Sequence, residues 1–283
     1  MPSATLLGQA FLSGLFLGGL YGLLGLGFSL SWGYLRVINL AHFGFAFLAA
    51  YLTYQLSGIA GLNVVLAILA VVPLFFALGL LMQFLFTRFA IGEFASLLVT
   101  FGLTVIIEVF IQWLWTADLR RLELPGSHTS LRLGPWFIPV VEASTFLICV
   151  AVSVGIWTWI RLTYAGKALR ASAEDPDIAA AFGIDHRRLA YVLSGLAMAC
   201  VGLGGAFIAL SFALFPSQIF AWVGIILAVV VLGGIGNALG VLLAGIGVGV
   251  SESLAMAVIE PSWAPLVSFS LLIAVLLFRR GDL

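Results

Sequence analysis

Residues 62–85 read LNVVLAILAVVPLFFALGLLMQFL, a stretch that contains no aspartate, glutamate, lysine or arginine. An α-helix needs about 20 consecutive apolar residues to cross the hydrocarbon core of a bilayer, and this stretch is long enough. It is too long and too continuously apolar for a transmembrane β-strand, in which lipid-facing and lumen-facing residues alternate. The pattern therefore predicts a membrane-spanning helix.

Similar apolar runs fill the rest of the chain. Of the 283 residues, 63% are hydrophobic and 8% are charged, and the mean hydropathy is +1.22. Soluble domains carry about 25% charged residues. The charged residues of this chain are too few to cover a water-exposed surface of this size. The candidate spans are 8–31, 37–56, 62–85, 94–116, 141–161, 189–211, 219–236, 240–258 and 264–279. We predict an all-α, polytopic membrane protein with about eight or nine spans, one of which can be re-entrant.

The basic residues predict the orientation, because cytoplasmic loops carry an excess of lysine and arginine. If residues 163–188 are cytoplasmic, nine of the twelve basic residues share that side, and only Arg120, Arg121 and Arg132 lie opposite. This arrangement places the N-terminus outside and the C-terminus inside, unless a re-entrant segment moves the N-terminus. Because Met1–Ala10 has no basic residue, we expect the first run to be a retained span and not a cleaved signal peptide.

Several classes of site are disfavoured. The net charge is zero, so no basic excess attracts nucleic acid. Cys149 and Cys200 are isolated in apolar runs, and no two of the three histidines share a helix at metal-ligand spacing. The phosphate loop G-x-x-x-x-G-K-[ST] does not occur. We therefore expect no catalytic, metal or cofactor site in this chain, which argues against an intramembrane enzyme acting on lipid.

Glycines recur every four residues in two of the predicted spans. Gly14, Gly18 and Gly22 lie in the first span, and Gly245 and Gly249 lie in the eighth. This spacing puts glycines on one stripe of a helix and lets two backbones approach closely. The stripes predict tight helix packing, with a gating hinge as the alternative.

The most charged segment, residues 163–188, reads TYAGKALRASAEDPDIAAAFGIDHRR. We expect one short helix from about Gly166 to Ala173. Asp175 then suits a helix N-cap and Pro176 suits the first helical turn, while Gly183 can end the second helix in a left-handed conformation. The pattern fits a rigid helical projection that receives mechanical work from a cytosolic partner, and equally a solvated linker.

Two further motifs accompany this loop. The first is YGLLGLG at 21–27 followed by WGYLRVINLAH at 32–42, and the second is LGGIGN at 232–237 followed by Gly240 and Glu252. Together with the loop, these motifs resemble the LivH-type permease subunit of the branched-chain amino acid ABC transporter family, in order and over nearly the whole chain. One departure is Phe43, which stands between His42 and Gly44 where family members often have glycine directly after the histidine.

The resemblance implies a single permease domain over 1–283, with residues 163–188 as its cytoplasmic coupling loop. The implied ATPase-coupling residues are Gly166, Lys167, Arg170, Glu174, Asp175, Pro176, Ala179, Gly183 and Ile184. The implied partners are a LivM-type permease subunit, two cytosolic ATPase subunits that bind the ATP, and a periplasmic or lipid-tethered solute-binding protein. The implied location is the cytoplasmic (inner) membrane of a bacterium or archaeon. The solute is expected to be a branched-chain or other hydrophobic amino acid, with urea or a short amide as the alternative.

Four polar residues inside the predicted spans are candidates for lining the translocation path: Asn39, His42, Glu108 and Glu252. Polar groups in lipid are costly unless they are paired or hydrated, so each either faces water or joins helices structurally. For Asn39 and His42, near a span end, the structural role is favoured. Glu108 and Glu252 also leave open an ion-coupled secondary transporter, which places such carboxylates near the bilayer midplane.

Overall fold

The computed structural model describes residues 3–123, 129–258, 266, 270 and 273, apart from the side chain of Leu133. Its long helices are α1 (Ala4–Leu35), α3 (Val64–Arg88), α4 (Glu93–Trp115), α5 (Val140–Leu162), α8 (His186–Ser211), α9 (Ile219–Gly233) and α10 (Ala238–Val258). Its shorter helices are α2 (Ala41–Thr53), which continues into a π-helix over Tyr54–Ile59, α6 (Tyr164–Glu174), α7 (Pro176–Ala181) and a 3-10 turn over Pro216–Gln218. Strands β1 (Ser130–Leu133) and β2 (Trp136–Pro139) form an antiparallel hairpin, which pairs Ser130 with Pro139.

The predicted helical membrane fold is confirmed. Seven of the described helices are long and apolar enough to cross a membrane, the 3-10 turn being counted with α9. Helix α2 is shorter, continues into the π-helix, and is buried over most of its length. The ninth expected span, 264–279, falls almost entirely outside the described residues.

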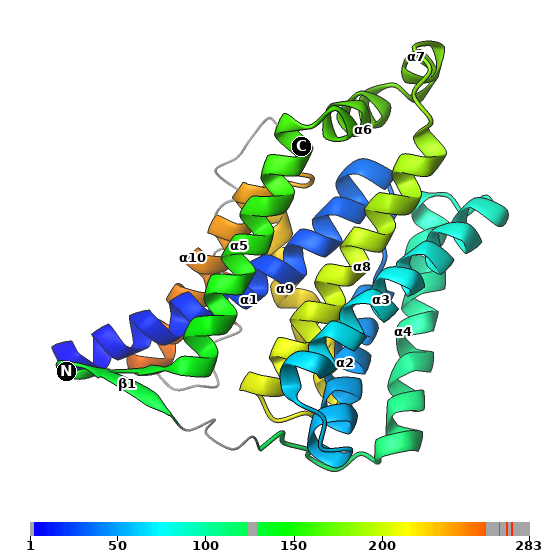
Figure 1. Ribbon diagram of the computed structural model, residues 1–283. Coiled ribbons are helices and arrows are strands. Elements are labelled where there is room, and N and C mark those ends of the chain that lie inside the picture. The colour runs from blue at the N-terminus through cyan, green and yellow to red at the C-terminus, as the bar shows by residue number, and fades with distance from the viewer. Residues whose placement is uncertain (1–2, 124–128, 259–265, 267–269, 271–272, 274–283) are drawn as a thin grey trace.

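The connections between helices gather at two opposite ends of the bundle (Figure 1). At one end lie α6 and α7, where the guanidinium of Arg36 donates a hydrogen bond to the Ala173 carbonyl at 3.3 Å. At the other end lie the N-terminus and the β-hairpin, where the Gln9 amide nitrogen donates to the Phe137 carbonyl at 2.8 Å. We call these the coupling end and the hairpin end.

The two glycine stripes meet, and the predicted tight packing is confirmed. Helices α1 and α10 run antiparallel and make the most extensive helix–helix interface in the described chain. A Cβ on Gly14 would lie 2.6 Å from the Val250 Cα, and one on Gly249 would lie 2.5 Å from the Gly18 backbone nitrogen. Such separations leave no room for a side chain, so the glycines set the distance between the helices.

The break between α1 and α2 is stabilised by α4. Residues 36–40 are not helical, and Arg36 adopts a left-handed conformation with φ of 53°. Two hydroxyls of α4 accept hydrogen bonds from backbone N–H groups in this break. The Ser96 hydroxyl accepts from Ile38 at 3.1 Å, and the Thr100 hydroxyl accepts from Leu40 at 2.9 Å. Backbone groups at membrane depth need such partners, so α4 fixes where α2 begins.

Candidate functional site

The loop at the coupling end folds as the sequence predicts. The N-cap of helix α6 is Thr163, whose hydroxyl accepts a hydrogen bond from the Gly166 N–H at 3.1 Å. The N-cap of helix α7 is Asp175, whose Oδ1 accepts hydrogen bonds from the N–H groups of Asp177 and Ile178, both at 3.0 Å. Gly183 follows α7 with φ of +79°, a left-handed conformation that favours glycine. Two capped helices therefore stand between the spans α5 and α8.

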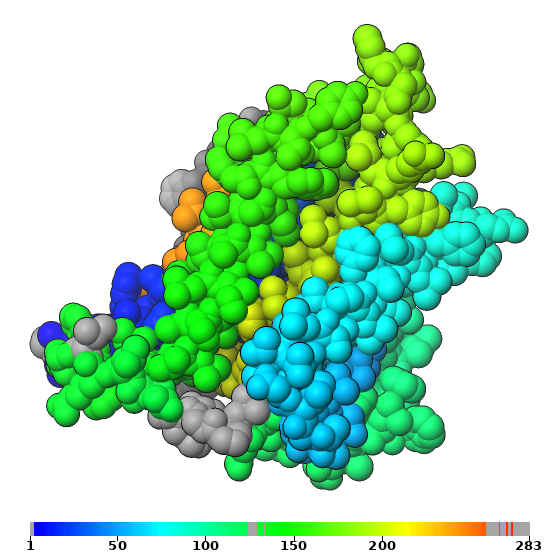
Figure 2. Space-filling model, viewed as in Figure 1, coloured from blue at the N-terminus to red at the C-terminus, as the bar shows by residue number. Residues whose placement is uncertain are grey.

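One face of this loop is packed and the other is open. Leu169 and Ala179 are buried, and a Cβ on Gly166 would collide with the Ile160 backbone, which holds α6 against the end of α5. Of the predicted coupling residues, Lys167, Arg170, Glu174, Asp175, Pro176 and Gly183 are exposed, Ile184 is half-buried, and Gly166 and Ala179 are buried. Helix α7 projects beyond the rest of the surface at this end (Figure 2).

Two residues that sequence analysis did not single out form the apolar tip of this projection. Ile178 is 59% exposed and Phe182 is 82% exposed. Ile178 lies in α7 and Phe182 is the C-cap that follows it. Their spacing of four residues, about one helical turn, was the available signal in the sequence. Large apolar side chains left exposed on a charged loop indicate an interaction surface.

Replacing Asp175 with alanine should loosen α7, because a lost N-cap typically costs about 1 kcal/mol and a helix of six residues has little other support. We expect the Asp177 and Ile178 amides to exchange with deuterium about fivefold faster. The matched control is Asp177→Ala, which removes a carboxylate from the same turn but no cap. Equal exchange in the two variants would contradict the capping role.

Glu252, a candidate path residue, is tied to another helix. It is 6% exposed, and the hydroxyl of Tyr21 on α1 donates a hydrogen bond to its Oε2 at 3.1 Å. The Tyr21 ring packs edge-on against Trp222 of α9. This contact joins α10 to α1 and gives Glu252 a structural partner.

Tyr21→Phe should destabilise the fold, because it removes only the hydroxyl that donates a hydrogen bond to the buried carboxyl group of Glu252. A net loss of about 1 kcal/mol corresponds to a fall in Tm of about 2–4 °C for a chain of this size. Thermal unfolding in one detergent measures it, with Tyr164→Phe as the control, since Tyr164 is 79% exposed. An unchanged Tm for Tyr21→Phe would mean that the hydrogen bond contributes nothing to stability.

Asn39 and His42 lie inside the bundle near the start of α2. They are 4% and 1% exposed, and Asn39 Oδ1 and both ring nitrogens of His42 have no hydrogen-bond partner within the described residues. The His42 ring packs edge-on against Phe28 and lies so close to Gly27 that a Cβ there would be 2.7 Å from Nε2. Both polar groups are thus enclosed by packed side chains.

Glu108 is placed differently, half-buried at the edge of the buried face of α4. The Gln112 amide nitrogen donates to its Oε1 at 3.3 Å, one turn along the helix. Ile106, Val109 and Trp113, farther around the helix, are all more than half exposed, so Glu108 lies between the buried face and the outer face of α4. The four predicted path residues are therefore not gathered in one site.

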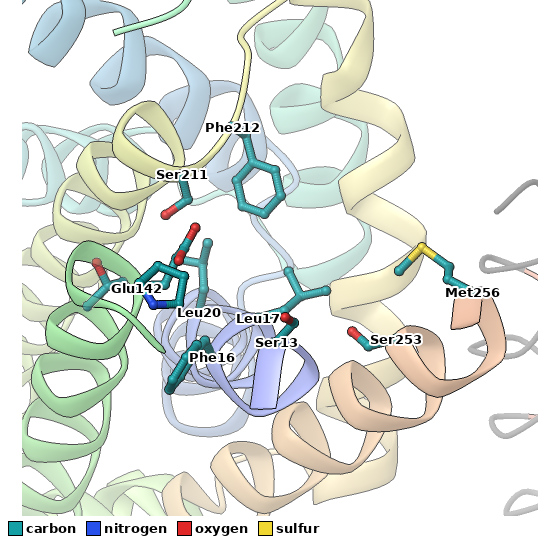
Figure 3. A pocket seen from close by; sticks show the side chains of 11 residues that line it. Ser13, Phe16, Leu17, Leu20, Glu142, Ser211, Phe212, Ser253 and Met256 are labelled. Atoms are coloured by element: carbon teal, nitrogen blue, oxygen red, sulfur yellow. The ribbon is translucent and has the colours of Figure 1, made fainter. Parts of the chain in front are cut away.

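A cavity of about 270 Å3 opens toward the hairpin end, and side chains from α1, α5, α8 and α10 converge on it (Figure 3). Its wall is mostly apolar and includes Phe16, Leu17 and Phe212. Glu142, in the first turn of α5, also lines it, and Glu142 Oε2 is buried without a hydrogen-bond partner in the described part of the chain. The cavity thus combines an apolar wall with one unpaired carboxylate.

Comparison with known proteins identifies the family. The family described as branched-chain amino acid transport system / permease component matches residues 10–276. The high-affinity branched-chain amino acid transport permease LivH of Escherichia coli K12 is 24% identical over 95% of this chain and 92% of its own. The corresponding BraD protein of Pseudomonas aeruginosa is also 24% identical, over 96% and 93% of the two chains. A probable LivH permease of Methanocaldococcus jannaschii is 31% identical over 121 residues, which cover 42% of this chain and 37% of that protein.

No solved structure matches the chain. The relatives are named as transport permeases, so the function is permeation and not enzymatic catalysis. The match covers nearly the full length and agrees with the helical membrane fold. The chain belongs to the family of branched-chain amino acid transport system permease components.

Proposed function

We propose that this chain is the LivH-type permease subunit of an ATP-driven importer for branched-chain or similar apolar amino acids, in the cytoplasmic membrane of a bacterium or archaeon. The observation that carries the proposal is the capped, projecting pair α6–α7 with its exposed apolar tip. Separate cytosolic ATPase subunits bind and hydrolyse the ATP. A solute-binding protein delivers the amino acid at the hairpin end.

The geometry of α6–α7 suits the transmission of force. Helix α6 is held to α5 through the close approach of Gly166 to Ile160, and to the end of α1 through the hydrogen bond from Arg36. A force applied to the apolar tip, formed by Ile178 and Phe182, is therefore transmitted to the spans α5 and α1 and is not dissipated in a flexible loop. Lys167, Glu174 and Asp175 of the same loop are also exposed.

The outer face of α4 suits contact with a second, LivM-type permease subunit. Glu108 and Gln112 lie in a helix whose outer face is otherwise apolar. A carboxylate facing lipid costs several kcal/mol, so this face is better accommodated against a partner or a hydrated path. Of the four predicted path residues, Glu108 is therefore the one that we retain as facing the path, and Asn39, His42 and Glu252 act inside the bundle.

The cavity at the hairpin end suits an amino acid with an apolar side chain. The ammonium group supplies the cation that the unpaired Glu142 carboxylate lacks, and the wall formed by Phe16, Leu17 and Phe212 accepts the side chain. Urea and short amides carry no charge and would leave the Glu142 carboxylate without a counter-charge. The cavity therefore favours an amino acid over the alternative solutes of the family.

The test is to substitute Glu174, Asp175 and Gly183 together in the complete transporter. We expect the folded variant to lose co-purification with the ATPase subunits and to lose ATP-driven leucine uptake. The same loss should follow from Ile178→Ser with Phe182→Ser, whereas Leu131→Ser at the hairpin end should change neither. Unchanged ATP-driven uptake would overturn the coupling assignment, and uptake driven by a pH gradient without ATPase subunits would favour an ion-coupled transporter.

A further inference from the structure

A second cavity lies at the coupling end, beneath α6. It measures about 330 Å3 and is lined by Tyr34, Trp157, Ile160, Arg161, Arg170, Gly236, Asn237 and Ala238. These residues come from the last turns of α1 and α5, from α6, and from the turn between α9 and α10 with the first residue of α10. We call this cavity the basic pocket.

The basic pocket concentrates positive charge that nothing in the described chain neutralises. Two guanidinium groups, Arg161 and Arg170, line it, and no carboxylate does. Within the described residues the one ion pair joins Arg188 to Asp185, so neither arginine has an acidic partner there. Two like charges on one cavity repel each other, and an anion between them would remove that repulsion.

The positions of both arginines are constrained. The Arg161 guanidinium lies over the Trp157 ring, 5.3 Å from its centroid. Arg170 is carried by α6, which the close approach of Gly166 to Ile160 holds against α5. The Trp157 ring thus orients Arg161, and the packing of α6 fixes the backbone position of Arg170 on the same cavity.

Polar groups complete the opposite wall. The Tyr34 hydroxyl donates to the Gly236 carbonyl at 3.1 Å, which fixes the turn before α10 in place. Asn237 Oδ1 accepts the Gly240 N–H at 3.1 Å, and no hydrogen bond of its amide nitrogen occurs within the described residues. An anion held by the two arginines can thus also accept from an amide donor.

The location selects the anion. The pocket lies at the end of α5, where Trp157 and Trp159 occur in the last turns, and tryptophan is enriched at the membrane–water interface. The excess of basic residues assigns this end to the cytoplasmic leaflet, which carries anionic lipids. Guanidinium groups bind phosphate through paired, charge-assisted hydrogen bonds.

We infer that the basic pocket binds the phosphate headgroup of an anionic membrane phospholipid through Arg161 and Arg170. The headgroup bridges α5, α6 and the turn before α10, so it stabilises the helix that carries the projecting α7. This inference depends on the membrane fold and not on the proposed ATPase coupling.

The test measures lipid binding to the purified full-length chain in nanodiscs of phosphatidylcholine with added phosphatidylglycerol, by native mass spectrometry after release. We expect phosphatidylglycerol to be retained in preference to phosphatidylcholine. Arg161→Gln with Arg170→Gln should lower that retention about tenfold, since each charge-assisted contact is among the stronger hydrogen bonds. The control, Arg187→Gln with Arg188→Gln, removes the same charge from the same end and should retain the lipid.

Two further measurements keep the result interpretable. Equal Tm values for the variants and the wild type in phosphatidylcholine alone show that the arginine substitutions leave the fold intact. The second measurement is of Arg161→Lys with Arg170→Lys, which should restore part of the lipid binding. Equal retention by the Arg161/Arg170 variant and the wild type would overturn the inference. A rise in Tm with 10 mM inorganic phosphate, without lipid, that equals the rise with phosphatidylglycerol would also overturn the inference. The ligand would then be free phosphate.

Discussion

Gly249→Val is expected to prevent stable assembly of the helix bundle, whereas Gly247→Val, two residues away on the same helix, is expected to be tolerated. A Cβ on Gly249 would lie 2.5 Å from the backbone nitrogen of Gly18, and backbone cannot move aside without separating α1 from α10. A Cβ on Gly247 meets nothing within 4 Å. Overpacking a tight contact costs about 1–3 kcal/mol, and more when backbone must shift.

The comparison separates packing from helix propensity. Glycine in a helix interior is about 1 kcal/mol less favourable than alanine, so Gly247→Ala should stabilise the chain slightly. Gly249→Ala brings the same gain in propensity but adds the clash, and should lower Tm. Expression level and thermal unfolding of the four variants in one detergent measure the difference. If Gly249→Ala and Gly247→Ala behaved alike, the contact between the stripes would not control stability.

The glycine stripes and the loop helices were predictable because both depend on local sequence. Spacing alone places Gly14, Gly18 and Gly22 on one side of a helix. Likewise, two adjacent residues, Asp175 and Pro176, predict the start of α7, and Asp175 caps the helix as expected. Neither inference needed knowledge of which helices pack together, although the structure shows that the two stripes meet each other.

The surroundings of the polar residues were not predictable, because they depend on pairing of distant segments. Glu252 accepts a hydrogen bond from Tyr21, which lies 231 residues earlier in the chain. Glu142, at the start of a span, would be expected to face water, yet one of its oxygens is buried beside a cavity built by four helices. The π-helical end of α2 and the hairpin between α4 and α5 also carry no clear sequence signal.

The two ends of the molecule therefore carry different kinds of surface. At the coupling end, the apolar side chains of Ile178 and Phe182 and the two arginines of the basic pocket are exposed. At the hairpin end, the carboxylate of Glu142 faces inward, onto a cavity. This division fits the proposed importer, in which ATPase subunits act at the coupling end and the solute enters at the hairpin end.

In the complete transporter, Glu142→Gln is expected to lower ATP-driven leucine uptake about tenfold or more. The substitution keeps the shape of the side chain and removes the negative charge that would meet the ammonium group. A hydrogen bond to a charged group contributes about 1.5–3 kcal/mol, and each 1.4 kcal/mol corresponds to a factor of about ten in affinity. Uptake at a series of leucine concentrations measures the effect, which should appear mainly as a raised KM.

Glu123→Gln is the matched control. Glu123 lies at the same end of the molecule and lines a neighbouring cavity together with Glu142, but it does not line the cavity of Figure 3. If the two variants lost uptake equally, the effect would come from the general charge at the hairpin end and not from recognition of the solute. A fall in maximal rate with unchanged KM would place Glu142 in the conformational cycle instead. Only a raised KM confined to Glu142→Gln fits direct contact with the ammonium group, because that contact contributes before any helix has moved.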